Sequence, residues 1–132
     1  MSHENLAIVR EIHEALARGE SPVPLGLLSP DIEYVNPPDA VEPGTRQGIA
    51  GYEDALRSMR EAFQSIRIEV RDIKEAGDEI VVLATFIARG SGSGIQRQHE
   101  DGFVWTVRDG KAVRFQWFND PAKALKAVGL SE

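Results

Sequence analysis

The chain contains no cysteine among its 132 residues. Disulfide bonds, thiolate metal ligands and a cysteine nucleophile are therefore excluded. No apolar run reaches the roughly 18 residues that a membrane-spanning helix needs, so we expect no membrane partner. The first residues lack a basic stretch followed by an apolar one, which predicts no signal peptide. Together these absences indicate a cytoplasmic protein.

Positive charge is also scarce. The 15 lysines and arginines are outnumbered by 21 aspartates and glutamates, and the net charge of −6 argues against a nucleic-acid partner. Apolar residues make up 42% of the chain, enough for one hydrophobic core. Because two domains of this total length would each bury too little apolar surface, we predict a single domain over residues 1–132.

The hydrophobic pattern predicts helices in three places. Apolar residues recur at helical spacing over residues 5–18 and over residues 49–63, and residues 22–29 should form one or two helical turns. Near the end of the chain, Asp120 is expected to cap a short helix that has Pro121 in its first turn. Gly129 should end that helix.

Strands are predicted by alternating and by continuous apolar runs. A short strand is expected at residues 32–35, and residues 36–48, with three prolines and two glycines, should form a loop. Four antiparallel strands then follow at residues 66–71, 80–87, 99–107 and 112–119. The glycine-serine loop at residues 90–94 lacks the lysine of a phosphate-binding loop. This order predicts an α+β fold.

The last two strands meet at residues 108–111, and two registers compete there. A two-residue loop would pair Arg108 with Lys111 and place Trp105 on the same face as Arg114. A three-residue loop would pair Val107 with Lys111 and make one face aromatic. Because a one-residue slip exchanges the two faces of a strand, the hydrophobic pattern favours the three-residue loop. The predicted facing pairs are Trp105 with Val113, Phe103 with Phe115, Asp101 with Trp117, and His99 with Asn119.

The aromatic face becomes polar at its far end, which is the usual composition of a ligand pocket. The alternative interpretation is a helix-covered core edge, with His99 and Asp101 at its solvated rim. The opposite face suits solvent or a fairly polar dimer contact, since it alternates polar residues with Val104 and Phe118.

Five short motifs stand out along the chain. They are Ala-Leu-Ala-Arg-Gly at 15–19, Asp-Ile-Glu-Tyr-Val-Asn-Pro at 31–37, Gly-Ile-Ala-Gly-Tyr at 48–52, Trp-Thr-Val-Arg-Asp-Gly-Lys at 105–111 and Phe-Asn-Asp at 118–120. With the element order and the closing segments 124–125 and 128–130, they resemble the SnoaL-like branch of the nuclear transport factor 2-like superfamily. The resemblance implies a curved antiparallel sheet wrapped around N-terminal helices into a cone, a cystatin-like α+β barrel. It also implies a hydrophobic pocket and commonly a homodimer.

The catalytic patterns of this superfamily are incomplete here. Ketosteroid isomerases carry a basic aspartate where this chain has Asn36, a tyrosine near Ile12 and an acidic aspartate near Phe103. Limonene-type epoxide hydrolases carry a Tyr-x-Asn pair, which Tyr34 and Asn36 match. Residues 84–87 lack the Arg-x-Asp pair of those hydrolases, and Trp117 stands at their second aspartate.

SnoaL-type cyclases use a histidine and an aspartate, and His99 and Asp101 are of these types although their positions do not align. A carboxyl group beside aromatic rings is desolvated, which raises its pKa and suits acid–base work. We therefore predict Asp101 and His99 as catalytic residues, with a rim ion pair as the alternative. Two such residues without a third ligand predict no metal. The predicted ligand-binding residues are His13, Tyr34, Asn36, Phe103, Trp105, Phe115, Trp117 and Asn119.

Several of these residues have a structural alternative. His13 on the apolar stripe of its helix suits a hydrogen-bonded core position, and Asn36 suits a loop cap. The first functional hypothesis is a pocket for a small apolar molecule, with cofactor-independent isomerisation, cyclisation or hydrolysis. The second is a non-catalytic dimeric ligand-binding or interaction module that uses the outer sheet face.

Overall fold

The computed structural model describes residues 2–17, 25–36, 44–90 and 96–130. Its elements, in chain order, are α1 (Ser2–Ala17), the 3-10 turn η1 (Leu25–Leu27), β1 (Leu28–Asn36), β2 (Gly44–Gln47), α2 (Gly48–Ala62), β3 (Phe63–Ala76), β4 (Glu79–Gly90), β5 (Gln96–Arg108), β6 (Lys111–Phe118) and α3 (Pro121–Ala127). The two long helices and the short last helix predicted from the sequence are confirmed. No helix in the described ranges is long and apolar enough to cross a membrane.

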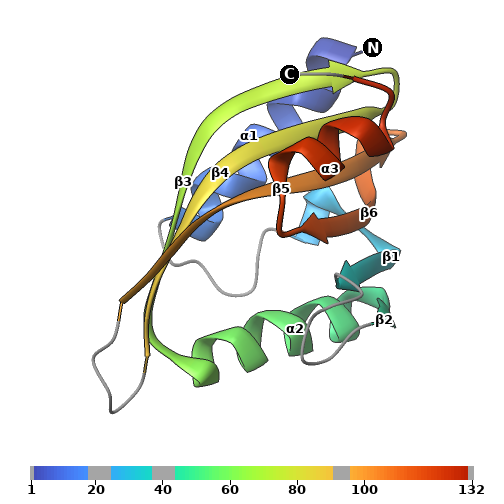
Figure 1. The fold of residues 1–132 in the computed structure, drawn as a ribbon. Coiled ribbons are helices and arrows are strands. Elements are labelled where there is room, and N and C mark those ends of the chain that lie inside the picture. The colour runs from blue at the N-terminus through green and yellow to red at the C-terminus, as the bar shows by residue number, and fades with distance from the viewer. Residues whose placement is uncertain (1, 18–24, 37–43, 91–95, 131–132) are drawn as a thin grey trace.

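The strands form one six-stranded sheet with the order β2-β1-β6-β5-β4-β3. The four strands from β3 to β6 pair antiparallel, as predicted, whereas β1 joins β6 in parallel. The sheet curves around α1 and α2, and α3 lies against its other face (Figure 1). The predicted α+β fold with a curved sheet around N-terminal helices is confirmed.

The region between residues 28 and 48 differs from the prediction. The first strand begins at Leu28, so the expected helical turn is limited to η1 within the described residues. Part of the predicted loop is a strand, because β2 pairs antiparallel with β1 from Gly44 to Gln47. Residues 37–43 of that loop, and residues 91–94 of the predicted glycine-serine loop, lie outside the described residues.

The hairpin between β5 and β6 has a two-residue loop, and the predicted three-residue loop is wrong. Asp109 and Gly110 both have positive φ, 52° and 77°, which is typical of a type I′ turn, and Arg108 pairs with Lys111. A bulge follows at Val113, since Val107 pairs with Ala112 while Thr106 pairs with Arg114. The register beyond the bulge pairs Trp105 with Phe115 and Phe103 with Trp117.

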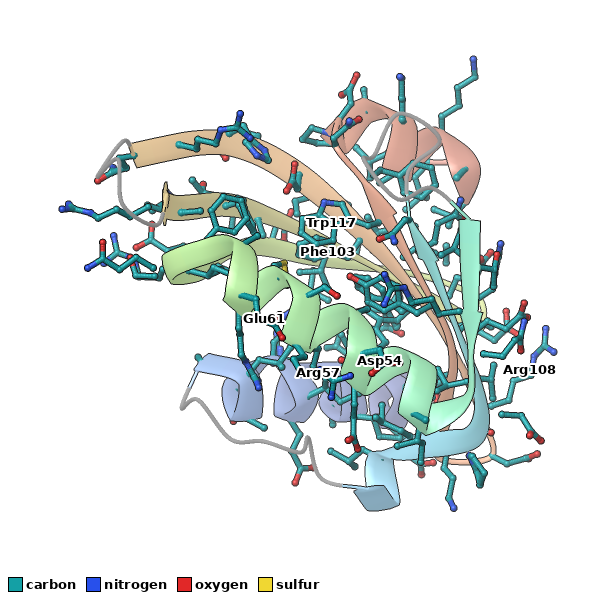
Figure 2. All side chains as sticks on the ribbon, turned by 90° about the horizontal axis from the view of Figure 1, so that it is seen from below. Asp54, Arg57, Glu61, Phe103, Arg108 and Trp117 are labelled. Atoms are coloured by element: carbon teal, nitrogen blue, oxygen red, sulfur yellow. The ribbon has the colours of Figure 1, made fainter. Side chains whose placement is uncertain are left out.

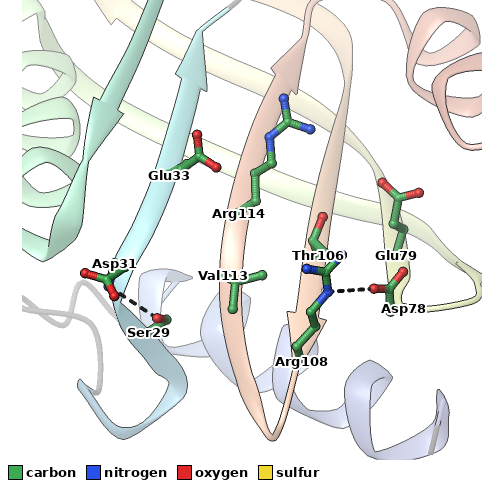
Figure 3. Close-up of a pocket in the computed structure, with 9 residues that line it drawn as sticks. All are labelled: Ser29, Asp31, Glu33, Asp78, Glu79, Thr106, Arg108, Val113 and Arg114. Atoms are coloured by element: carbon green, nitrogen blue, oxygen red, sulfur yellow. Dashed lines mark hydrogen bonds and ion pairs between the residues drawn. The ribbon is translucent and has the colours of Figure 1, made fainter.

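Despite this change of register, the side chains of β5 and β6 lie on the predicted faces of the sheet, with two exceptions. Val113 lines a groove on the outer face together with Arg114 (Figure 3). Asn119 follows the end of β6, is exposed and does not pair with His99, which lies opposite Phe86 of β4. The aromatic face predicted from alternation is otherwise the one that faces the helices.

Apolar residues form a layer on each face of the sheet. The inner layer packs between the sheet and helices α1 and α2, and Trp105 at its centre is fully buried. The outer layer joins Val81 and Val104 to Ala124 and Leu125 of α3. The prediction that the outer face meets solvent or a partner is therefore wrong around Val104, where α3 covers it.

The start of α3 agrees with the prediction. Asp120 Oδ1 accepts a hydrogen bond from the Ala122 backbone N–H at 2.9 Å, which satisfies one of the unpaired amides of the first turn. Gly129 after the helix has φ of 79°, the left-handed conformation that ends many helices.

Candidate functional site

A cavity of about 490 Å³ lies between α1, α2 and β3. Its apolar lining residues are Leu16, Ala17, Leu56, Met59, Phe63, Ile66 and Ile68. Its polar lining residues are His13, Arg60, Gln64, Ser65, Arg67 and Glu69. The volume suits a drug-sized molecule, and the mixture of an apolar wall with a few polar groups is the usual composition of a ligand site.

Most of this wall is missing from the predicted ligand-binding set. The sequence signal was present, because the apolar stripe of the second helix continues past Tyr52 to Met59 and Phe63. The core buries Tyr52, whereas Met59 and Phe63 are only partly buried and border the cavity. Of the predicted ligand-binding residues, His13 lies in the wall.

His13 connects the cavity wall to the core. Its side chain stacks on Phe103 with ring centroids 5.9 Å apart. The Trp105 indole Nε1–H donates a hydrogen bond to His13 Nε2 at 3.1 Å. Burial lowers the pKa of His13 from 6.5 to about 4, so the imidazole is neutral near pH 7.

The polar end of the aromatic face holds a buried carboxylate. Asp101 is fully buried on β5. His99 Nδ1 lies 2.8 Å from Asp101 Oδ1, and Trp117 Nε1–H donates to Asp101 Oδ2 at 3.1 Å. Desolvation raises the pKa of Asp101, and the neighbouring His99 and the hydrogen bonds from His99 and Trp117 oppose that rise.

His99 differs from Asp101 in its access to solvent. Its side chain is 46% exposed, while that of Asp101 is 0% exposed. When Asp101 is ionised it only accepts hydrogen bonds, so Nδ1 of His99 then carries the proton toward Asp101 and Nε2 is the basic nitrogen. The imidazole is therefore the member of the pair that a ligand can reach.

A continuous series of ring contacts connects His13 to His99. Phe103 contacts Trp117 at 5.4 Å, Trp117 contacts Phe86 at 5.5 Å, and Phe86 stacks on His99 at 5.1 Å between centroids. Figure 2 shows Phe103 and Trp117 between the sheet and α2. Since Phe63 of the cavity wall also contacts Phe86, at 6.0 Å, the cavity and the His99–Asp101 pair share one aromatic surface.

The remaining predicted residues have other surroundings. Tyr34, Trp105 and Phe115 are buried in the core, where Tyr34 lies 4.9 Å from Phe115 between ring centroids. Burial raises the pKa of Tyr34 above its ordinary value, so the phenol is neutral. Asn36 is the last residue of β1, and Asn119 lies beyond β6.

A second and larger hollow, of about 700 Å³, lies on the outer face of the sheet (Figure 3). Its lining includes four carboxylates and two arginines, and Arg108 Nε bonds to Asp78 Oδ2 at 3.0 Å. Charged groups in a solvated groove are well hydrated and offer a small apolar molecule little stabilisation. Within the described residues, no group of three His, Cys, Asp or Glu side chains could hold a metal ion.

Residues 9–115 match the sequence profile of the SnoaL-like domain family. The chain belongs to this family. No curated protein matches it significantly.

Solved structures of the same fold agree with this assignment. An NTF2-like protein of unknown function from Burkholderia pseudomallei is 26% identical, with a TM-score of 0.80 and coverage of 96% of this chain and 98% of that one. TerC, co-crystallised with polyporic acid, is 26% identical, with a TM-score of 0.78 and coverage of 95% and 97%. IdmH from Streptomyces antibioticus, a proposed polyketide cyclase, is 21% identical, with a TM-score of 0.74 and coverage of 96% and 99%.

Proposed function

We propose that this SnoaL-like protein binds a small, largely apolar molecule in its cavity and that His99 exchanges a proton with that molecule. The observation that carries the proposal is a half-exposed imidazole whose Nδ1 is fixed by a fully buried carboxylate. The likeness to TerC, which was co-crystallised with polyporic acid, and to a proposed polyketide cyclase supports it. Both observations fit acid–base chemistry beside an apolar site.

His99 is the proposed catalytic residue. Its Nε2 would remove a proton from a carbon that is next to a ligand carbonyl or conjugated with it through a ring. The electron pair of the C–H bond would form a new C=C bond, and the π pair of the carbonyl would move onto its oxygen. Returning the proton from the imidazolium to another atom completes an isomerisation. Attack by the enolate carbon on a second carbonyl closes a ring, and the imidazolium then protonates the alkoxide that forms. Asp101 has both carboxylate oxygens engaged, by His99 and Trp117, so it acts as a positioning residue that stabilises the imidazolium.

Anthrone is a suitable probe, because it combines a fused-ring apolar body with an acidic CH₂ group opposite its carbonyl. In D₂O without oxygen, the wild-type protein should accelerate exchange of the CH₂ hydrogens, as followed by mass spectrometry. His99→Asn keeps a donor toward Asp101 but removes Nε2, and it should slow the exchange by about 100-fold or more. Gln98→Asn changes the adjacent exposed residue, which points to the other face of β5, and should leave the rate unchanged.

Asp101→Asn tests the positioning role separately. An amide stabilises an imidazolium less than a carboxylate does, so Asp101→Asn should slow the exchange of the anthrone hydrogens. Anthrone affinity should stay the same, since Asp101 is buried behind His99. A purely structural role of Asp101 would instead weaken anthrone binding together with the exchange rate.

Equal exchange rates for wild type and His99→Asn would contradict the catalytic part of the proposal. The function is then a non-catalytic ligand-binding or interaction module. One observation favours this second candidate: His99 is separated from Ile68 of the cavity wall by the intervening residue Phe86 on β4. This second candidate function includes a homodimer that forms through the part of the outer sheet face not covered by α3. Native mass spectrometry tests for the dimer.

A further inference from the structure

We infer that His13 donates a hydrogen bond from Nδ1 to a carbonyl oxygen of the ligand, so that the cavity selects ketones and quinones over hydrocarbons of the same shape. The inference rests on the proposed function in one respect, namely that the cavity binds a small molecule. It does not require that His99 be catalytic.

The first step concerns which nitrogen of His13 carries the proton. The Trp105 indole nitrogen only donates hydrogen bonds, so His13 Nε2, at 3.1 Å from it, must accept. A neutral imidazole with an accepting Nε2 carries its hydrogen on Nδ1. Trp105 is fully buried among Tyr52, Phe115 and His13, which holds the indole in place and with it the tautomer.

The second step concerns where Nδ1 points. Trp105 is the hydrogen-bond partner of His13 within the described residues, and it occupies Nε2. Among the described residues, every fully buried side-chain nitrogen or oxygen has a hydrogen-bond partner. Nδ1 is therefore not enclosed by the core. His13 is 8% exposed and lines the cavity, so Nδ1 is accessible from the cavity.

The third step concerns what such a donor recognises. The adjacent wall residues Leu16, Leu56 and Met59 contribute apolar surface that fixes no orientation. A single N–H in these surroundings stabilises a ligand that places an acceptor oxygen against it, because the donor is otherwise left poorly solvated. It gives no such gain to a ligand of equal size that lacks the oxygen.

Anthrone and 9,10-dihydroanthracene form a matched pair, since the second has the same three-ring frame without the carbonyl. Their affinities are measured by calorimetry for wild type and variants. Wild type should prefer anthrone, and His13→Phe should reduce that preference by about five- to tenfold, the effect of one net hydrogen bond. His13→Gln keeps an N–H donor and should retain part of the preference. Glu14→Gln, exposed on the same helix, should retain all of it.

Infrared spectroscopy gives an independent readout. Hydrogen bonding should shift the carbonyl stretch of bound anthrone to lower frequency in wild type and less in His13→Phe. Trp105→Phe is a second variant in case His13→Phe does not fold. It removes the indole N–H that fixes the tautomer and should also reduce the ketone preference.

The outcomes separate the inference from the proposed function. If His13→Phe binds both compounds with the wild-type preference and the wild-type carbonyl frequency, the inference is wrong, and ligand binding in the cavity still holds. If wild type binds neither compound, both the inference and the binding part of the proposed function are overturned. Loss of proton exchange in His99→Asn has no bearing on the ketone preference.

Discussion

His13 ties α1 to the middle of the sheet through its hydrogen bond with Trp105. Since burial lowers its pKa from 6.5 to about 4, the unfolded chain takes up a proton at this histidine before the folded chain does. Folding stability should therefore fall as the pH falls from about 6.5 to about 4, and this contribution should change no further below that window. The full loss is about 3 kcal/mol, from about 1.4 kcal/mol for each pKa unit.

Urea unfolding at pH 7 and pH 4.5 measures this effect. His13→Gln has no titrating group at this position, so it should lose less stability between the two pH values than wild type. Arg10→Gln, exposed on the same helix, should behave as wild type does. Equal losses in wild type and His13→Gln would show that His13 does not carry the pH dependence.

Single residues also explain why the sequence identified a face but not a register. A two-residue turn at Asp109 and Gly110 pairs Trp105 with Arg114 unless one strand contains an extra residue. The bulge at Val113 supplies that residue, and bulges have no strong local sequence pattern. The shorter loop shifts the pairing by one residue, and the bulge shifts it by one more. Because a shift of two residues restores the original face, alternation still predicts correctly that Phe103 and Phe115 point inward.

At the scale of elements, the contact between α3 and the sheet depends on one glycine. A Cβ atom added at Gly102 would lie 2.4 Å from Ala124 Cβ, a distance that requires the helix to move. Gly102→Ala should therefore destabilise the protein by about 1–3 kcal/mol, as overpacking does elsewhere. Combining it with Ala124→Gly should recover part of the loss, because the second change removes the clashing atom.

Chemical denaturation of the two single variants and the double variant measures this coupling. Gly26→Ala serves as the control, because a Cβ at Gly26 would have no atom within 4 Å. Strictly additive effects of the Gly102 and Ala124 substitutions would mean that the two residues do not compete for space.

The elements that the sequence missed are those fixed by distant contacts. The strand β2 follows a stretch rich in proline, and its four residues gain their structure from pairing with β1. The parallel ladder of β1 with β6 joins residues from opposite ends of the chain, which no local pattern records. The pair His99 and Asp101 is visible in the sequence as a local i, i+2 spacing, whereas the apolar stripe that ends at Met59 and Phe63 does not show which elements it faces. The cavity wall exists because α1, α2 and β3 meet in three dimensions.

At the scale of the whole molecule, the sheet separates two apolar layers. A ligand in the cavity touches α1, α2 and β3 on the inner side, while α3 packs on the outer side. Binding of 9,10-dihydroanthracene should therefore slow amide hydrogen exchange in α1, α2 and β3 and leave α3 nearly unchanged. Hydrogen-exchange mass spectrometry with and without the compound tests this. A uniform increase in protection that includes α3 would contradict binding in the cavity.

The parallel pairing of β1 with β6 has a consequence for the order in which the chain acquires its structure. A ribosome produces β1 before β3, β4 and β5, and β6 after them, so the edge of β1 that pairs with β6 has no partner while β3, β4 and β5 can already pair with one another. Pairings between distant segments form slowly, because closing a long loop costs entropy before any contact repays it. The edge of the cone formed by β1 and β2 is therefore expected to assemble last. Until then Tyr34 and Phe115, which meet only across that junction, remain available to solvent, proteases and chaperones.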